Sequence, residues 1–181
     1  MKKTVAFFGH RLLWGREIRE RVKKEIESNL NEDVCCLVGT HGEFDSLVLS
    51  VCREIKKDFP NLKITVVFTS LNVLQKRKGE IYSDADMYKD VDTVIYDIEE
   101  EYYKKQIEIS NRKMVDESDL IICYIDKERR NSGAKKAVAY AIKQGKRVIN
   151  LFQEQDRPFY GMTSEEKEKK WKEFISNDIK Q

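Results

Sequence analysis

Short apolar stretches alternate along the chain with segments in which apolar residues recur at every third or fourth position. The short stretches are rich in β-branched residues and have the length of strands, whereas the longer spacing is typical of helices that bury one side. Strands and helices in alternation predict parallel strands joined by helices. The strands are expected at residues 4–8, 34–38, 62–68, 93–96, 120–125 and 147–151.

Helical segments separate these strands, except between residues 69 and 90, where the apolar residues follow neither the spacing of a helix nor that of a strand. A stretch of that length is either a functional loop, such as a lid, or an ordinary solvated loop. Residues 120–125 are almost wholly apolar, which is typical of a strand covered on both faces. The sequence therefore predicts a Rossmann-like three-layer α/β/α sandwich with a mainly parallel sheet. The buried sides of the four helices are expected at Ile18, Val22, Ile26 and Leu30; Phe44, Leu47, Val48, Val51, Cys52 and Ile55; Tyr103, Ile107, Ser110 and Met114; and Ala134, Ala137, Val138 and Ala141.

All residues from 1 to 181 are expected to form one domain, because a chain of this length can bury a core without disulfides or a metal. The core is expected at about residues 3–151 and a charged, helical tail at about residues 152–181. In the tail, Thr163 and Glu166 have the spacing of a capping box, which predicts a last helix that ends near residue 175. We expect Trp171 and Phe174 to dock this helix.

Composition narrows the classes of function. Hydrophobic residues make up 40% of the chain and charged residues 36%, which is typical of a globular protein with a heavily charged surface. The 34 basic and 32 acidic residues leave a formal net charge of +2, so we expect no nucleic-acid partner. The first apolar stretch is too short for a signal peptide or a membrane span. We therefore expect a cytoplasmic protein with no membrane partner.

The cysteines fall in predicted strands or on an apolar side of a helix, so we expect them to be reduced core residues. The chain has no C-x-x-C pair and only two histidines. We therefore expect no metal site. We also expect no bound cofactor. The four cysteines are Cys35, Cys36, Cys52 and Cys123.

Polar and glycine residues follow three of the predicted strands. Residues 39–45 read Gly-Thr-His-Gly-Glu-Phe-Asp, so a buried strand leads into a glycine turn and then a helix. Such a junction presents free N–H groups at the positive end of the helix dipole, where phosphates bind. Because ligands of open α/β sheets bind at the carboxyl ends of the strands, we expect these turns to line one site. The candidate ligand-binding residues are Gly9, His10, Arg11, Gly39, Thr40, His41, Gly42, Glu43, Asn131, Ser132 and Gly133.

Some of these residues could also have roles that involve no ligand. Arg11 suits a phosphate because of its fork of donors, and we favour this role over a surface ion pair. Each histidine either faces the cleft or makes a structural hydrogen bond. Glu43 and Asp45 complement the helix dipole, and one that faced the ligand would accept hydrogen bonds from ribose hydroxyls or adenine amino groups.

The phosphate itself is assigned to the start of the helix after residue 131, because carboxylates at the other helix start would repel it. Ser132 and Gly133 are the expected contacts there. Asn131 is either a third contact or only the N-cap of this helix. Lys135 and Lys136 either add charge near the phosphate or are solvated.

Three segments together resemble the SLOG superfamily, which groups the DprA/Smf proteins with the LOG cytokinin phosphoribohydrolases, over about residues 3–151. The Gly-His-Arg turn at residues 9–11 is similar to that of the small bacterial branch that includes YpsA and the prophage protein YoqJ. Residues 38–45 resemble the second, glycine-rich motif. Residues 112–133 resemble the LOG arrangement of an Arg-bearing helix, a Ser-Asp strand start and a glycine loop.

The resemblance implies a protein that binds a nucleotide or nucleotide-derived small molecule, as a sensor, carrier or sequestering protein. It also implies that Arg112, which matches the Arg of LOG enzymes, contacts the ligand. The alternative is a LOG-like nucleoside-monophosphate N-glycosidase. Such a reaction needs a carboxylate, and because the LOG Glu is missing here, only Glu43 or Asp45 is available. Arg112 is the candidate that would act with this carboxylate.

The likeness to DprA adds single-stranded DNA binding as a third hypothesis. The near-neutral charge and the lack of a basic, aromatic stripe argue against it. Relatives commonly pair through helices, so the resemblance also implies a homodimer.

Overall fold

The computed structural model describes residues 3–15, 17–30, 33–69, 87–96, 102–129, 132–158, 160–166 and 168–169. The six described strands form one sheet in the order β4-β3-β2-β1-β5-β6, and all neighbours are parallel. This is the Rossmann-like α/β fold that the sequence predicts. The strands are β1 (Lys3–Gly9), β2 (Val34–Val38), β3 (Lys63–Phe68), β4 (Asp92–Ile95), β5 (Leu120–Tyr124) and β6 (Arg147–Asn150).

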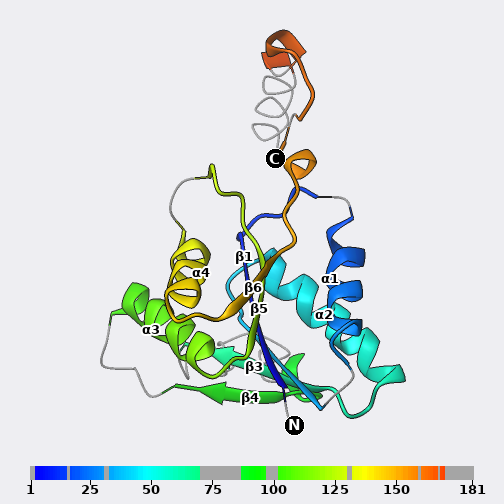
Figure 1. The fold of residues 1–181 in the computed structure, drawn as a ribbon, viewed down its shortest axis with the longest axis vertical. Coiled ribbons are helices and arrows are strands. Elements are labelled where there is room, and N and C mark those ends of the chain that lie inside the picture. The colour runs from blue at the N-terminus through cyan, green and yellow to red at the C-terminus, as the bar shows by residue number, and fades with distance from the viewer. Residues whose placement is uncertain are drawn as a thin grey trace, which may run out of the picture.

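Helices cover both faces of the sheet (Figure 1). Successive residues of a strand point to opposite faces, so Val5 and Phe7 of β1 pack on one side and Ala6 and Phe8 on the other. The side of Val5 is covered by α1 (Ile18–Glu27) and α2 (Glu43–Asp58). The opposite side is covered by α3 (Tyr103–Asp116) and α4 (Gly133–Lys143). Because both faces are covered, β2 and β5 are buried along their whole length.

The predicted strands are confirmed, with each boundary within one residue of the prediction. Helix α1 ends at Glu27, three residues before the last predicted apolar position, although Leu30 still packs against the core. A left-handed turn at Gly145, where φ is 71°, follows α4. The capping box is also confirmed, because the N–H of Thr163 donates to Glu166 and the N–H of Glu166 donates to Thr163. Trp171, Phe174 and residues 70–86 lie outside the described residues.

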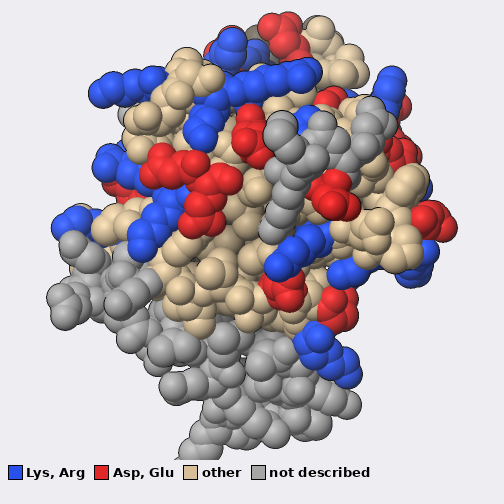
Figure 2. Space-filling model, turned by 60° about the horizontal axis from the view of Figure 1, so that its bottom comes forward, with Lys and Arg blue, Asp and Glu red and all other residues tan. Residues whose placement is uncertain are grey.

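All four cysteines are free and buried, as predicted. Burial raises the pKa of the Cys123 thiol to about 12, so this thiol is a core residue rather than a nucleophile. None of the helices in the described ranges is long and apolar enough to cross a membrane. Figure 2 shows basic and acidic side chains interspersed over one face of the molecule.

The order of the strands reverses at β1. From β1 the chain adds β2, β3 and β4 outward on one side, and then returns to add β5 and β6 on the other side. A crevice forms at such a reversal, outside the carboxyl ends of the two central strands, because the connections leave in opposite directions. The turns that follow β1 and β5 therefore border the position where a ligand is expected.

Candidate functional site

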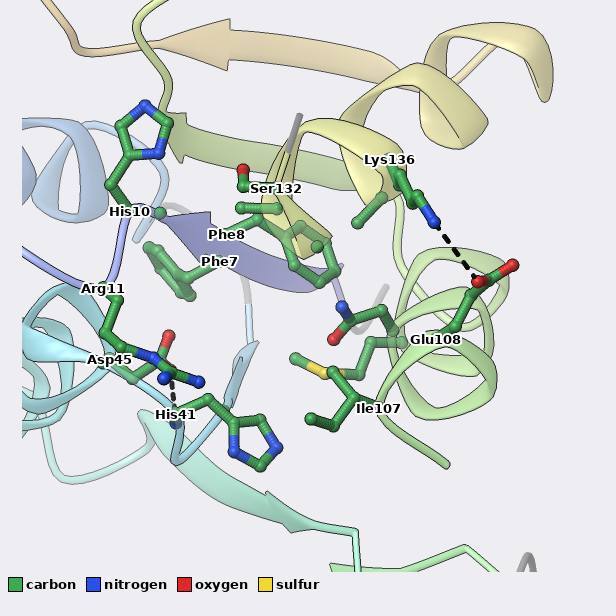
Figure 3. A pocket seen from close by; sticks show the side chains of 18 of the residues that line it. Phe7, Phe8, His10, Arg11, His41, Asp45, Ile107, Glu108, Ser132 and Lys136 are labelled. Atoms are coloured by element: carbon green, nitrogen blue, oxygen red, sulfur yellow. Dashed lines mark hydrogen bonds and ion pairs between the residues drawn. The ribbon is translucent and has the colours of Figure 1, made fainter. Parts of the chain in front are cut away.

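A cavity of about 860 Å³ lies at this carboxyl edge (Figure 3). Its walls come from the end of β1, the turn after β2, the start of α2, one side of α3 and the first turns of α4. A volume of this size is typical of small-molecule sites. The cavity brings together most of the residues that the sequence singles out, namely Gly9, His10, Arg11, Gly39, His41, Gly42, Asp45, Arg112, Ser132 and Gly133. Thr40 and Glu43 are not among the lining residues, and Asn131 lies outside the described residues.

The turns after β1 and β2 pack directly on each other. A Cβ atom at Gly9 would lie 2.2 Å from the ring of Phe44, so glycine is needed for α2 to approach β1. A Cβ atom at Gly42 would lie 2.8 Å from the Cα of Arg11. The N–H of Glu43 also donates to the carbonyl of Arg11 over 2.9 Å. These contacts fix the first turn of α2 against the end of β1.

The two carboxylates at the start of α2 have different positions. Glu43 accepts a hydrogen bond from the N–H of Leu13 over 2.8 Å, which holds the loop after β1 and leaves Glu43 outside the cavity wall. Asp45 lines the cavity and accepts a hydrogen bond from the N–H of His41 over 2.7 Å. Desolvation raises the pKa of Asp45 to about 6, although the N–H groups of His41 and Gly42 oppose this shift. Because Asp45 already occupies these N–H groups, the turn before α2 is a poor place for a phosphate.

Both histidines supply hydrogen-bonding groups rather than charge. The Nε2 atom of His10 accepts a hydrogen bond from the N–H of Asp126 over 2.9 Å, so this residue makes a structural hydrogen bond and also lines the cavity. Burial lowers the pKa of His10, and Arg129 adds to this effect. Burial also lowers the pKa of His41, with a further contribution from Arg11. Both rings are therefore neutral at pH 7.

The first turn of α4 presents hydrogen-bond donors to the cavity. Ser132 is the N-cap, because its Oγ accepts a hydrogen bond from the N–H of Lys135 over 3.2 Å. No group of the described residues accepts a hydrogen bond from the N–H groups of Gly133 and Ala134. The side-chain amide of Asn111 is close by, since its nitrogen lies 3.8 Å from the position of a Cβ atom on Gly133. An amide donor of α3 therefore lies close to the first turn of α4.

The two neighbouring lysines have different roles. The Nζ of Lys135 donates to the carbonyls of Lys127 over 2.8 Å and Arg129 over 2.6 Å, so Lys135 holds the loop between β5 and α4. Lys136 lines the cavity, and its Nζ lies 3.7 Å from a carboxylate oxygen of Glu108.

The side of α3 that faces the cavity carries residues that the sequence-based reasoning missed. Glu108 pairs with Arg112 over 2.8 Å, and the guanidinium of Arg112 lies 5.5 Å from the ring centre of Tyr140. The signal in the sequence is the helical spacing, because the lining residues of α3 recur at every third or fourth position and form one side of the helix. That signal becomes informative only once α3 is known to lie beside α4. The missed lining residues with polar side chains are Lys104, Glu108 and Asn111 of α3 and Tyr140 of α4.

The charges around the cavity favour an anion. Four cationic side chains and two carboxylates line it, which gives a net charge of +2 when both carboxylates are ionised. Within the described ranges, no three His, Cys, Asp or Glu side chains are grouped as a metal ion would require. The cavity therefore suits an anionic organic molecule with polar groups at several points. The six charged residues are Arg11, Lys104, Arg112, Lys136, Asp45 and Glu108.

Comparisons with known proteins agree with this architecture. A model of the YspA SLOG family matches residues 6–156. The DNA processing protein A (DprA) of Streptococcus pneumoniae has a similar solved structure, with a TM-score of 0.57 and 19% sequence identity. That match covers 81% of this chain and 49% of the DprA chain, so this chain spans about half the length of that protein. A search of curated proteins gave no match.

Proposed function

The chain belongs to the YspA SLOG family, and from this premise we propose that it binds a nucleotide or nucleotide-derived small molecule in the cavity at the carboxyl edge of the sheet. One observation carries the proposal. Gly133 and Ala134, whose N–H groups have no acceptor among the described residues, line a cavity to which four cationic side chains also contribute. Such an arrangement is typical of a phosphate site. The protein would act as a sensor, carrier or sequestering protein.

The rest of the ligand would extend from α4 toward the start of α2. The phosphate would bind at Gly133 with the help of Asn111, because the other helix start is already occupied by Asp45. The apolar side chains of Phe8, Ile107 and Met114 offer a surface for a sugar or base. Asp45 and His41 would then meet the polar groups of the base or ribose.

Calorimetry with the purified protein tests this proposal. The ligands would be mono-, di- and cyclic nucleotides and ADP-ribose, preceded by mass spectrometry of small molecules released on denaturation. Binding should also stabilise the fold, by about 2.7 kcal/mol at a ligand concentration one hundred times the Kd. Arg112→Gln should weaken binding, whereas Arg19→Gln, which changes a charge on α1 outside the cavity, should not. Absence of any binding across this panel would refute the proposal.

A second candidate is N-glycosidic hydrolysis of a bound nucleoside monophosphate. The observation that favours it is the raised pKa of Asp45, about 6, because a carboxyl group in that range can exchange a proton near neutral pH. Incubation with AMP should then release adenine, and Asp45→Asn should abolish the release. Glu43→Gln is the matched control, because Glu43 contacts Leu13 rather than the cavity. An intact nucleotide after incubation would leave only the binding function.

Single-stranded DNA binding is a further hypothesis that the name of the DprA neighbour suggests. The mixed charges in Figure 2 offer no single basic field on that face, which argues against it. A mobility shift that weakens steeply with salt would support it. A homodimer is likewise a proposal, and light scattering at several protein concentrations would test it.

A further inference from the structure

Glu108 is a carboxylate that pairs with two cations in the cavity wall. It lies on α3 between two cations, Arg112 at 2.8 Å and Lys136 at 3.7 Å, and all three residues line the cavity. Figure 3 shows the contact from Glu108 to Lys136, which crosses from α3 to α4. Its carboxylate therefore lies where two cationic side chains of the cavity wall converge.

The net charge of the cavity bears on how many phosphates a ligand can bring into it. With Glu108 and Asp45 both ionised, the cavity carries +2, which matches the charge of about −1.5 to −2 of a single phosphomonoester at pH 7. Each further phosphate adds negative charge and needs further cations. Among the lining cations, Lys136 belongs to α4 and Arg112 lies over the ring of Tyr140 of α4, and Glu108 already pairs with both.

We propose that Glu108 is a specificity-determining residue that restricts the cavity to ligands with one terminal phosphate. The inference rests on the proposed function, because it assumes that a phosphate binds at the first turn of α4. In this proposal a first phosphate at Gly133 and Asn111 would leave the two ion pairs of Glu108 in place. A second phosphate that extended toward Lys136 would approach the carboxylate of Glu108. Both groups are negatively charged, so they would repel each other.

Neutralising this carboxylate should change the discrimination between ligands. We would measure the Kd of AMP and of ADP by calorimetry for the wild type and for Glu108→Gln. The wild type should bind AMP more tightly than ADP. In Glu108→Gln the affinity for ADP should rise on the order of tenfold, since one repulsive charge is removed, and the affinity for AMP should change less. The ratio of the two Kd values is therefore the decisive readout.

Glu54→Gln is the matched control. Glu54 also pairs with two cations, Arg19 at 2.5 Å and Lys23 at 2.6 Å, and its side chain is 39% exposed, against 41% for Glu108. It does not line the cavity, so its substitution changes the net charge equally without altering the site. Both variants should leave the ratio of folded to unfolded protein nearly unchanged, because exposed ion pairs contribute little to stability.

The outcomes separate the inference from the proposed function. An unchanged ratio in Glu108→Gln, or an equal change in Glu54→Gln, would overturn the role of Glu108 and leave nucleotide binding intact. Tighter binding of ADP than AMP by the wild type would also overturn it. If the wild type binds no nucleotide of the wider panel, the proposed function fails and the inference fails with it.

Discussion

The imidazole of His10 accepts a hydrogen bond from the backbone N–H of Asp126 over 2.9 Å, and this bond joins the turns after β1 and β5 where the strand order reverses. Asp126 is held in turn by Arg157, which donates two hydrogen bonds to its carboxylate. The segment that follows β6 is thus connected through Asp126 to a wall of the cavity. The position of that wall depends on an acceptor that must stay unprotonated.

Acid should therefore weaken the fold through His10. Because burial lowers the pKa of His10 below the 6.5 of an unfolded histidine, its stabilising contribution is complete above pH 6.5. Below that pH the unfolded chain takes up a proton that the folded chain does not, and stability falls. His10→Gln keeps an acceptor that does not titrate. Between pH 7 and pH 5, urea unfolding should show that the wild type loses up to about 2 kcal/mol more than His10→Gln. Parallel pH profiles would contradict this assignment.

The glycines of the site should differ in what they tolerate. Gly9→Ala would place a Cβ atom 2.2 Å from the ring of Phe44, and overpacking of this kind costs about 1–3 kcal/mol or more. Gly133→Ala meets only the amide of Asn111 at 3.8 Å, which is ordinary contact. We expect thermal unfolding to show a clear loss of Tm for Gly9→Ala and little change for Gly133→Ala. Equal losses would mean that Gly9 has no special packing role.

The strands were predictable because each fold-defining pattern is local. Residues 34–38 and 120–124 are apolar throughout, and such a continuous apolar run is typical of a strand that is covered on both faces. The glycine turns were also recognisable, because Gly9 and Gly42 mark close approaches of the backbone. The local sequence pattern was therefore sufficient to predict the strands and helices, and to predict at which edge of the sheet the cavity lies.

The composition of the cavity wall was less predictable, because it depends on which helices lie side by side. Glu108, Lys136 and Tyr140 belong to helices whose packing no local pattern specifies. The difference between Glu43 and Asp45 has the same origin. Both residues are acidic and occupy the first turn of α2, but only the fold brings the N–H of Leu13 to Glu43 and leaves Asp45 in the cavity.

The ion pair of Arg21 and Asp156 should be important for stability. Asp156 is 4% exposed and pairs with Arg21 over 2.6 Å and 2.9 Å, which fastens the segment after β6 to α1. Arg21→Met would leave a buried charge without its partner, at a cost of about 3–5 kcal/mol. The double variant with Asp156→Leu should be less destabilised than this single variant, because no lone charge is left.

A matched surface pair provides the control for that measurement. Arg53 pairs with Asp90 over 2.6 Å, but the side chain of Asp90 is 50% exposed. Arg53→Met should cost about 1 kcal/mol or less in urea unfolding. If both arginine variants lose the same free energy of unfolding, the burial of Asp156 does not set the strength of the pair.

The contribution of Asp45 to the stability of the fold should depend on pH in the opposite direction to that of His10. Its pKa is raised from 3.8 to about 6 in the folded chain, so above pH 6 a desolvated carboxylate destabilises the fold. As the pH falls through 6 the folded chain takes up a proton first, and the cost disappears by about pH 3.8. Asp45→Asn removes this cost but keeps an acceptor for the N–H of His41. The variant should therefore gain about 1–3 kcal/mol relative to the wild type on going from pH 4 to pH 7. A difference that does not vary with pH would show that this carboxyl group is not desolvated, and the same result would remove the basis for a proton-exchanging role of Asp45 in the cavity.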